Sequence, residues 1–595
     1  MAFGIRRNAA LDIAALSTCL LGLVGVLVLV LRVKVGAEGV PRLAYLGFLA
    51  MVCGPFLLAF SRMPKVLYLI PPVIAVFILY PITSPHGIVY YSDPVFNFSF
   101  TDQILASGFW VPGRGNAFAR AYSFYPIGNV FIAYVTLTVG LPPAQAYMWI
   151  EPLLRFLALP ATVFSIANRL FGGRTAVLAL FFYLGTASIL FNVPVQQGMG
   201  VVFVGLSLLA LVVLTQVTGK TSRARAQIVF ALVGAGIVMT HHLSSYVFAG
   251  WFAALAVLVL QRRYQPSVGA LRFGLLLGYY VAFLGLYVLT FTYPIFQTQY
   301  GTLDDAIAGF IAPEEAPAGT QGAALGRTFS PFETAWLAGS VLVLLLLALA
   351  TIQRYRATGQ NRFAVANGIV ASAVTLVSLP LIVTPLNFVP LRISEFANFF
   401  IAPLAATTLL RWSRIGPPNG PLLPTITRNR GWMTPAGVLV VSALLFMGGN
   451  LAPLTMRLYF ESPAARTTDS PLFLGSDAVR SADWARAHYG GGRVWGDQLA
   501  VDTFSGFGGM PVDFGSARVF QNTTVDALVW SRVYVGDYVI VDRWMTILRP
   551  NFLHEPLSAA PLSAQQVEKF ATDRHFALVY QDESFSVYRV IAIGP

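Results

Sequence analysis

Apolar segments long enough to cross a membrane recur along the first 450 or so residues of the chain. A helix needs about 20 predominantly apolar residues to span about 30 Å of hydrocarbon. Thirteen segments meet this requirement: 11–31, 41–61, 66–83, 146–168, 175–191, 198–217, 227–242, 244–261, 270–290, 333–352, 363–384, 391–411 and 433–451. The pattern predicts a polytopic α-helical membrane protein with about 13 transmembrane helices over 1–452.

The basic residues of the connecting loops alternate between the two sides of this arrangement. Most of them fall on the side of the N-terminus: Arg62, Lys65, Arg169, Arg174, Lys220, Arg223, Arg225, Arg262, Arg263, Arg354, Arg356, Arg411, Arg414, Arg428 and Arg430. By the positive-inside rule that side is cytoplasmic, and the C-terminal part lies outside the cell membrane. One loop does not fit the pattern, because Arg32, Lys34 and Arg42 fall outside, near Glu38.

A shorter apolar stretch, 126–141, has to stay out of the span count for this alternation to hold. If it crossed, every later loop would change sides and the basic loops would lie outside. We therefore expect a helix that lies on the membrane surface or dips into it.

The outer loop 84–126 is polar, aromatic and rich in Gly and Pro, yet it carries few charges. Such a long loop is usually functional or disordered, and its aromatic content argues against disorder. Tyr91, Asp93 and Asp102 lie in it, although an Asp before Pro, as at Asp93, is also a common turn signal. We interpret the loop as the floor of an active site at the membrane surface.

Further ionisable residues fall on the same outer side. His241 and His242 end one span, and Arg392 and Glu395 begin another. Histidines also bridge apolar and aqueous regions without other function, and Arg392 and Glu395 are spaced so that they could simply pair. Ionisable groups at membrane depth are costly, however, and this favours a functional role. For the similarly spaced Glu151 and Arg155 we favour a structural role. A second outer loop, 291–332, carries acids best interpreted as a solvated charge run: Asp304, Asp305, Glu314 and Glu315.

Composition agrees with a membrane protein, since 56% of the residues are hydrophobic and 11% are charged. The net charge of +13 follows from the basic inner loops, so nucleic acid is not an expected partner. The two cysteines, Cys19 and Cys53, lie in apolar segments and imply no disulfide framework.

The tail, 453–595, is more polar and predicts a small extracytoplasmic α/β domain. Helical patterns cover 476–489 and 563–572, β-rich runs cover 493–497, 518–521 and 537–543, and a hairpin covers 576–590. No nucleotide-binding or metal-binding motif occurs in it. We expect it to fold alone and to help select an acceptor.

Several short patterns together resemble the C-type superfamily of glycosyltransferases (GT-C). They are the long outer loop with an early Asp, Tyr125-Pro126 before an amphipathic helix, and the stretch EPLLRFLALPATVFSIANRLFGGRTAVLALFFYLGTASIL. The motifs THHL at 240–243 and LRISEF at 391–396 are similar to segments of multi-pass members. The resemblance spans most of 66–450 and, more vaguely, the tail.

The resemblance implies transfer of a sugar from a polyprenyl-phosphate-linked donor to a glycan, lipid or protein acceptor at the outer face. Asp93 matches the loop carboxylate that acts as the catalytic general base in an inverting displacement. Arg392, His241 and His242 would stabilise the leaving phosphate. Tyr91 would offer a face for sugar stacking, and Asp102 and Glu395 complete the expected substrate-binding set. Membrane lipids surround the whole region.

The loop departs from the family pattern beside Asp93. Many members carry a second acid there, whereas Ser92 and Pro94 flank this one. Mg²⁺ or Mn²⁺ needs several oxygen ligands, so a metal cofactor stays open, with the acids of 291–332 as the remaining source of ligands. A transporter or lipid flippase would also have many spans, but the chain has no internal repeat. A non-catalytic assembly protein would not need 13 spans as an anchor.

Overall fold

The structure is a computed structural model of the 595-residue chain. It describes 12–24 in part, 92–112, 123–186 except 142, 196–293 except 262–263 and 265–269, 331–383, 388–412, four positions within 437–445, 466–471 in part, 476–511, 516–552 in part, and 561–594. Two predicted spans, 41–61 and 66–83, lie outside these residues, as does most of 433–451. The predicted domain boundary at 452/453 lies outside them as well.

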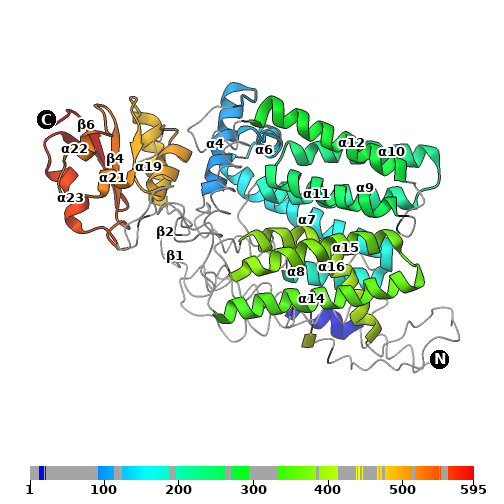
Figure 1. The fold of residues 1–595 in the computed structure, drawn as a ribbon. Coiled ribbons are helices and arrows are strands. Elements are labelled where there is room, and N and C mark those ends of the chain that lie inside the picture. Colours follow the sequence, from blue (N-terminus) through cyan, green and yellow to red (C-terminus); the bar gives the residue numbers. More distant parts are fainter. Residues whose placement is uncertain are drawn as a thin grey trace.

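Long apolar helices run side by side to form a bundle (Figure 1). They are α7 (Pro143–Phe171), α8 (Gly173–Thr186), α9 (Gln196–Gln216), α10 (Lys220–Val238), α11 (His242–Leu260), α12 (Ala270–Tyr287) with η4 (Val288–Thr292), α14 (Pro331–Thr358), α15 (Arg362–Ser378) with η5 (Leu379–Val383), and α16 (Phe388–Trp412). Each overlaps a predicted span, with ends that differ by up to seven residues. Among the described residues, seven helices are long and apolar enough to cross a membrane.

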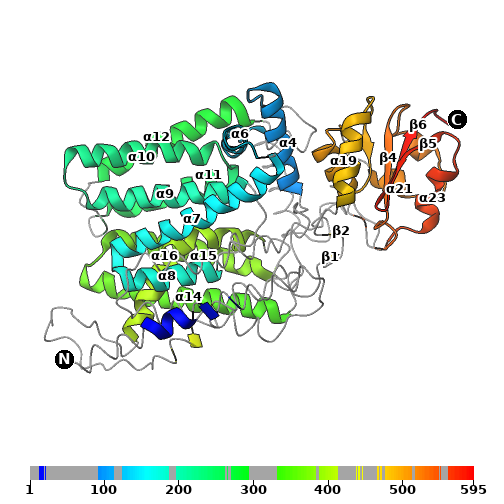
Figure 2. The same cartoon turned by 180° about the vertical axis from the view of Figure 1, so that it is seen from behind.

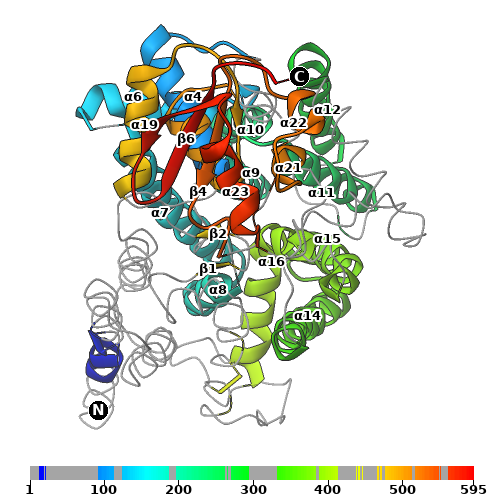
Figure 3. The ribbon, with the colours of Figure 1, turned by 90° about the vertical axis from the view of Figure 1, so that its left-hand side faces the viewer.

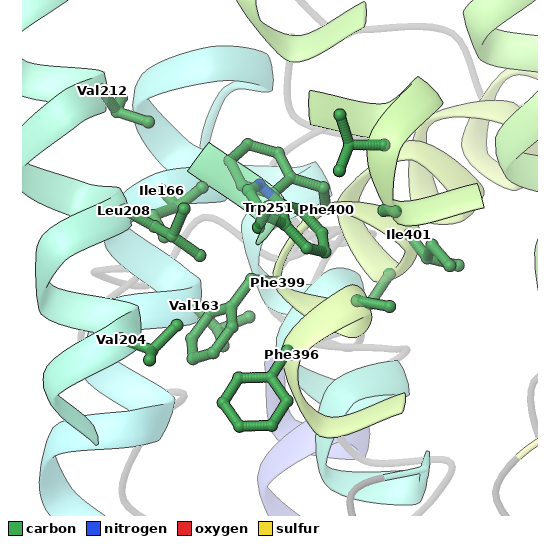
Figure 4. Packing of buried hydrophobic residues seen from close by; sticks show 14 of the residues in the cluster. Val163, Ile166, Val204, Leu208, Val212, Trp251, Phe396, Phe399, Phe400 and Ile401 are labelled. Atoms are coloured by element: carbon green, nitrogen blue, oxygen red, sulfur yellow. The ribbon is translucent and has the colours of Figure 1, made fainter. Parts of the chain in front are cut away.

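The core of the bundle lies where α7, α9, α11 and α16 meet. Figure 4 shows Val163 of α7, Val204 of α9 and Trp251 of α11 converging on Phe399 and Phe400 of α16. Helix α16 is largely buried, as expected for an apolar helix in the interior of a larger bundle. Seen from behind, α7 crosses the bundle obliquely toward the end that carries α4 (Figure 2).

Basic connections from different parts of the chain meet at one end of the bundle. The Arg169 guanidinium donates to Gln216 at 3.4 Å, and the Asn361 amide donates to the Leu170 carbonyl at 2.6 Å. The charges of Arg354 and Arg411 both act on Tyr355. The alternation predicted from the sequence is therefore realised as a basic end of the described bundle.

Two helices cross the opposite end. Helix α4 (Ser92–Ser107) lies within the predicted outer loop, and α6 (Ile127–Val139) is the apolar stretch that was expected not to cross. In Figure 1 both run across the direction shared by α9–α12, as a surface helix would. Helix α6 ends where Gly140 adopts φ 75°, a left-handed conformation that glycine accepts at little cost.

Beyond this end lies a separate α/β unit with its own core (Figure 3). Its four-stranded sheet has the order β3-β4-β6-β5, with β3 parallel to β4 and the other pairs antiparallel. Its elements are the short pair β1 (Arg466–Thr467) and β2 (Ser470–Pro471), then α19 (Ser476–His488), β3 (Val494–Trp495), α20 (Gln498–Val501), η6 (Asp502–Phe507), α21 (Ser516–Phe520), α22 (Ala527–Trp530), β4 (Tyr538–Asp542), α23 (Ala564–Thr572), β5 (Phe576–Gln581) and β6 (Phe585–Val590).

Most elements predicted for this unit are present, and one is wrong. The two helices and the hairpin agree closely with α19, α23, β5 and β6, and Ser563 caps α23 through a capping box with Gln566. The run 518–521, predicted as β-rich, instead lies at the end of helix α21. Val519 and Phe520 are fully buried there, and a short apolar run cannot by itself distinguish a buried strand from a buried helical turn.

Two carboxyl groups are buried together at the carboxyl ends of the parallel strands β3 and β4. Asp497 follows β3 and accepts a hydrogen bond from the Ala500 N–H at 3.0 Å, while Asp542 ends β4 and accepts from Trp544 N–H at 2.8 Å. Burial and the neighbouring Asp542 raise the pKa of Asp497 well above its usual range, and Asp502 acts in the same direction. Burial also raises the pKa of Asp542, against the opposing charge of Arg543. The pair therefore retains a proton at pH values where exposed aspartates are ionised.

We expect the C-terminal domain to lose stability as the pH rises. A carboxyl group whose pKa is higher in the folded state than in the unfolded state stabilises the fold while it is protonated. This stabilisation is complete below the unfolded-state pKa, about 4, and is lost as the pH rises through the folded-state pKa. In 470–595 expressed alone, Tm should fall as the pH rises above about 4, by roughly 4 °C for each kcal/mol lost. Asp497→Asn should remove most of this slope, because an amide donates to Asp542 without titrating. If Tm of Asp497→Asn fell with pH as steeply as Tm of the exposed control Glu583→Gln, the shared proton would be contradicted.

Candidate active site

The first turn of α9 connects the segments that gather at the end of the bundle crossed by α4 and α6. The Gln196 amide donates to the Tyr125 carbonyl at 3.1 Å, and the Gln197 amide donates to Glu395 Oε2 at 3.0 Å. Both glutamines and Glu395 are buried. The end of the outer loop, α9 and α16 are therefore held in one place, although long stretches of sequence separate them.

The two predicted histidines lie together beside this turn. His241 is the N-cap of α11, where its Nδ1 accepts from the Ser244 N–H at 3.3 Å and lies 3.0 Å from Ser244 Oγ. The ring centroids of His241 and His242 are 4.7 Å apart, and the His242 ring lies 5.6 Å from that of Tyr125. A ring nitrogen thus replaces the usual Ser or Asp at a helix N-terminus, which fixes the His241 ring and leaves its other nitrogen for another partner.

Arg392 and Glu395 lie one turn apart at the start of α16. Glu395 is fully buried on Gln197, and the charge of the half-buried Arg392 acts on both His241 and His242. The structure therefore brings together four predicted site residues from α11 and α16. A cationic guanidinium beside two imidazoles is an arrangement that can bind an oxyanion or a phosphate.

The sequence interpretation missed the surroundings of Glu151 and Arg155. This ion pair, with Glu151 Oε2 and Arg155 Nη2 3.4 Å apart, is buried in α7. It lies against α9, because a Cβ added to Gly198 would approach Glu151 Oε1 to 2.5 Å. Within the described residues, neither Glu151 oxygen has a hydrogen-bond partner. The pair adjoins the turn that carries Gln197, and a buried ion pair with unused acceptors is a costly feature to retain for structure alone.

Gly198→Ala tests how tightly α7 and α9 are packed at this point. The new methyl group would overlap Glu151, and such overpacking costs typically 1–3 kcal/mol. We expect lower thermal stability in detergent, followed by intrinsic fluorescence. The matched control is Gly250→Ala in α11, where a Cβ meets nothing within 4 Å and helix propensity gains up to about 1 kcal/mol. Equal stability of the two variants would contradict the close approach.

The remaining predicted site residues lie on or near α4. Asp93 is in its first turn, and Asp102 lies farther along, half-exposed and 3.8 Å from Arg486 of the C-terminal domain. Tyr91 lies outside the described residues, as do the acids of the loop 291–332. Among the residues that the structure describes, no three His, Cys, Asp or Glu side chains are grouped so as to hold a metal ion.

Comparison with known proteins gives likenesses in structure only. No protein-family model and no curated protein matches the sequence. The fold is similar to ArnT from Cupriavidus metallidurans in the apo state, with 14% identity, TM-score 0.49, and coverage of 89% of this chain and 99% of that one. ArnT bound to undecaprenyl phosphate gives 15% identity, TM-score 0.49 and the same coverage.

A third similar structure is the Archaeoglobus fulgidus oligosaccharyltransferase in complex with Zn and sulfate. It shares 9% identity at a TM-score of 0.48, over 80% of this chain and 68% of that one.

Proposed function

We propose that the chain is a membrane glycosyltransferase. It moves a sugar from a polyprenyl-phosphate-linked donor to an acceptor at the outer membrane face by inverting, base-assisted displacement. The observation that carries the proposal is the cluster of Arg392, His241 and His242 at the end of the bundle opposite the basic connections. In this orientation the N-terminus is cytoplasmic and the C-terminal domain is extracytoplasmic, as the positive-inside rule predicts.

The cluster suits the phosphate of the donor. When the bond between the anomeric carbon and the phosphate oxygen breaks, the leaving lipid phosphate gains negative charge. Arg392 can donate two parallel hydrogen bonds to phosphate oxygens, and each imidazole can donate one more. Glu395, buried on Gln197, fixes the turn of α16 that carries Arg392, so these donors are positioned before the reaction begins.

Asp93 supplies the base in this proposal. The acceptor hydroxyl attacks the anomeric carbon from the face opposite the phosphate, and its proton passes to the Asp93 carboxylate as the new C–O bond forms. Inversion at the anomeric carbon follows from this single displacement. Helix α4, whose first turn includes Asp93, packs against α6 and α7 across one end of the bundle (Figure 1). A divalent cation, if one takes part, would draw its ligands from the acids of 291–332.

The competing function is that of a lipid transporter or flippase, and one experiment separates the two. Purified protein is reconstituted into liposomes with polyprenyl-phosphate-linked sugars and an acceptor panel, with Mg²⁺, with Mn²⁺ or with EDTA. We expect release of polyprenyl phosphate together with formation of glycosylated acceptor. Movement of intact donor between leaflets with no product under any of these conditions would overturn it. Loss of product in EDTA alone would identify a metal requirement.

A further inference from the structure

Helix α4 lies between the membrane bundle and the C-terminal domain. It packs against α6 and α7 on one side and against η6 of the C-terminal domain on the other. Asn97 and Thr101, both on α4, are fully buried, although the sequence around them predicts an outer loop. Figures 1 and 2 show α4 between the two parts of the molecule. The position of α4 therefore depends on both.

The π-helix η6, which packs against α4, is held in the core of the C-terminal domain. Its Phe504 is fully buried in the core of the C-terminal domain, where its ring meets Phe585 of β6 edge-on with centroids 5.3 Å apart. Asp502, at the start of η6, is also fully buried. Short π-helical turns are uncommon and are found frequently at functional sites. The segment η6 is therefore packed into the core of the C-terminal domain and also against α4.

An ion pair crosses the same interface. Arg486 Nη2 of α19 lies 3.8 Å from Asp102 Oδ2 of α4, and both side chains are half-exposed. Such a pair adds little to stability. Asp102 follows Asp93 by nine residues, which places the two about 13 Å apart along a helix. A group at that distance does not share a reacting atom with Asp93, but it can set the rotation and tilt of the helix that carries it.

We propose that the C-terminal domain positions α4, and with it the Asp93 carboxylate, through η6 and the Asp102–Arg486 pair. This inference rests on the proposed function and assigns Asp102 and Arg486 as positioning residues. The alternative is the substrate-binding role that the sequence resemblance implies for Asp102, and the experiment below separates the two. The C-terminal domain is thus part of the catalytic unit.

A charge exchange in the full-length protein tests the inference. Asp102→Arg and Arg486→Asp each place like charges across the interface, and the double variant restores opposite charges. Arg574→Asp, at an exposed arginine elsewhere in the same domain, is the matched control. Two properties are measured in detergent: hydrogen exchange of 92–107, and kcat and KM for consumption of lipid-linked sugar.

Each single reversal should speed exchange of α4 and lower kcat by roughly three- to tenfold, since small misplacements of a reacting group are costly. KM for the donor should stay within about twofold, because the phosphate cluster lies on α11 and α16. The double variant should recover both properties, and the control should match wild type.

Two results would overturn the inference. One is exchange of α4 that is unchanged by Arg486→Asp. The other is turnover that falls in Asp102→Arg and stays low in the double variant, which would identify Asp102 as a substrate contact. A third outcome separates the two proposals. If even wild type shows no turnover, but hydrogen exchange of α4 is faster in the single variants and recovers in the double variant, the proposed glycosyltransferase function is overturned and the coupling of α4 to the C-terminal domain is supported.

Discussion

Asp93→Asn is expected to lower turnover of lipid-linked sugar by about 10²–10⁴-fold, the usual contribution of a general base. Asparagine has nearly the same size and can still accept a hydrogen bond, but it does not take the proton of the acceptor hydroxyl at neutral pH. Because the phosphate cluster is separate from α4, the affinity for the donor should be nearly unchanged. The effect should therefore appear in kcat and leave KM for the donor near its wild-type value.

The measurement is release of polyprenyl phosphate by purified protein in liposomes, with donor binding followed in parallel. Asp93→Glu, which restores a carboxylate on a longer side chain, should recover part of the rate. Asp483→Asn makes the same chemical change at an exposed position of α19 and should leave turnover unaltered. Wild-type turnover in a folded Asp93→Asn variant would remove Asp93 from the mechanism.

The second large effect is expected for Arg392→Ala. A hydrogen bond to a charged group contributes about 1.5–3 kcal/mol, so loss of the guanidinium should weaken donor binding by roughly 10- to 150-fold. Turnover at saturating donor should also fall, because the departing phosphate loses a cation in the transition state. His241→Ala and His242→Ala should have smaller effects, since each removes a single donor.

Helix α16 carries its own control. Arg411 lies at the opposite end of the same helix, among the basic connections, and Arg411→Ala should leave donor affinity unchanged. Arg392→Lys restores the positive charge but not the planar guanidinium, so its donor affinity should lie between those of wild type and Arg392→Ala. Donor affinity lowered equally by Arg392→Ala and Arg411→Ala would indicate a general loss of structure, and the phosphate-binding role would have no support.

A local hydrophobic pattern was enough to predict the membrane bundle. A segment of about 20 apolar residues has few stable arrangements other than a transmembrane helix, because its backbone must satisfy its hydrogen bonds internally. The limits of α9, α11 and α16 consequently agree with the predicted spans to within three residues. The elements of the tail with strong local signals, α19, α23 and the β5–β6 hairpin, were predictable for the same reason.

Candidate site residues were also accessible from the sequence, but their partners were not. Ionisable groups at span ends are conspicuous, so His241, His242, Arg392 and Glu395 could be chosen without a structure. Nothing local indicates that Glu395 accepts a hydrogen bond from Gln197, 198 residues earlier in the chain. Two glutamines before an apolar run look like ordinary helix-terminal residues until the packing of α9 against α16 is known.

Tertiary structure alone decided the features that depend on contacts between distant segments. The run 518–520 is helical, with Val519 and Phe520 packed into the core of the C-terminal domain, and α4 lies against η6 of that domain. Gly198 has to be glycine because α7 brings Glu151 against α9. Periodicity reports how one segment divides apolar from polar surface. It carries no information about which other segment will cover that surface, and this choice is made by packing over the whole chain.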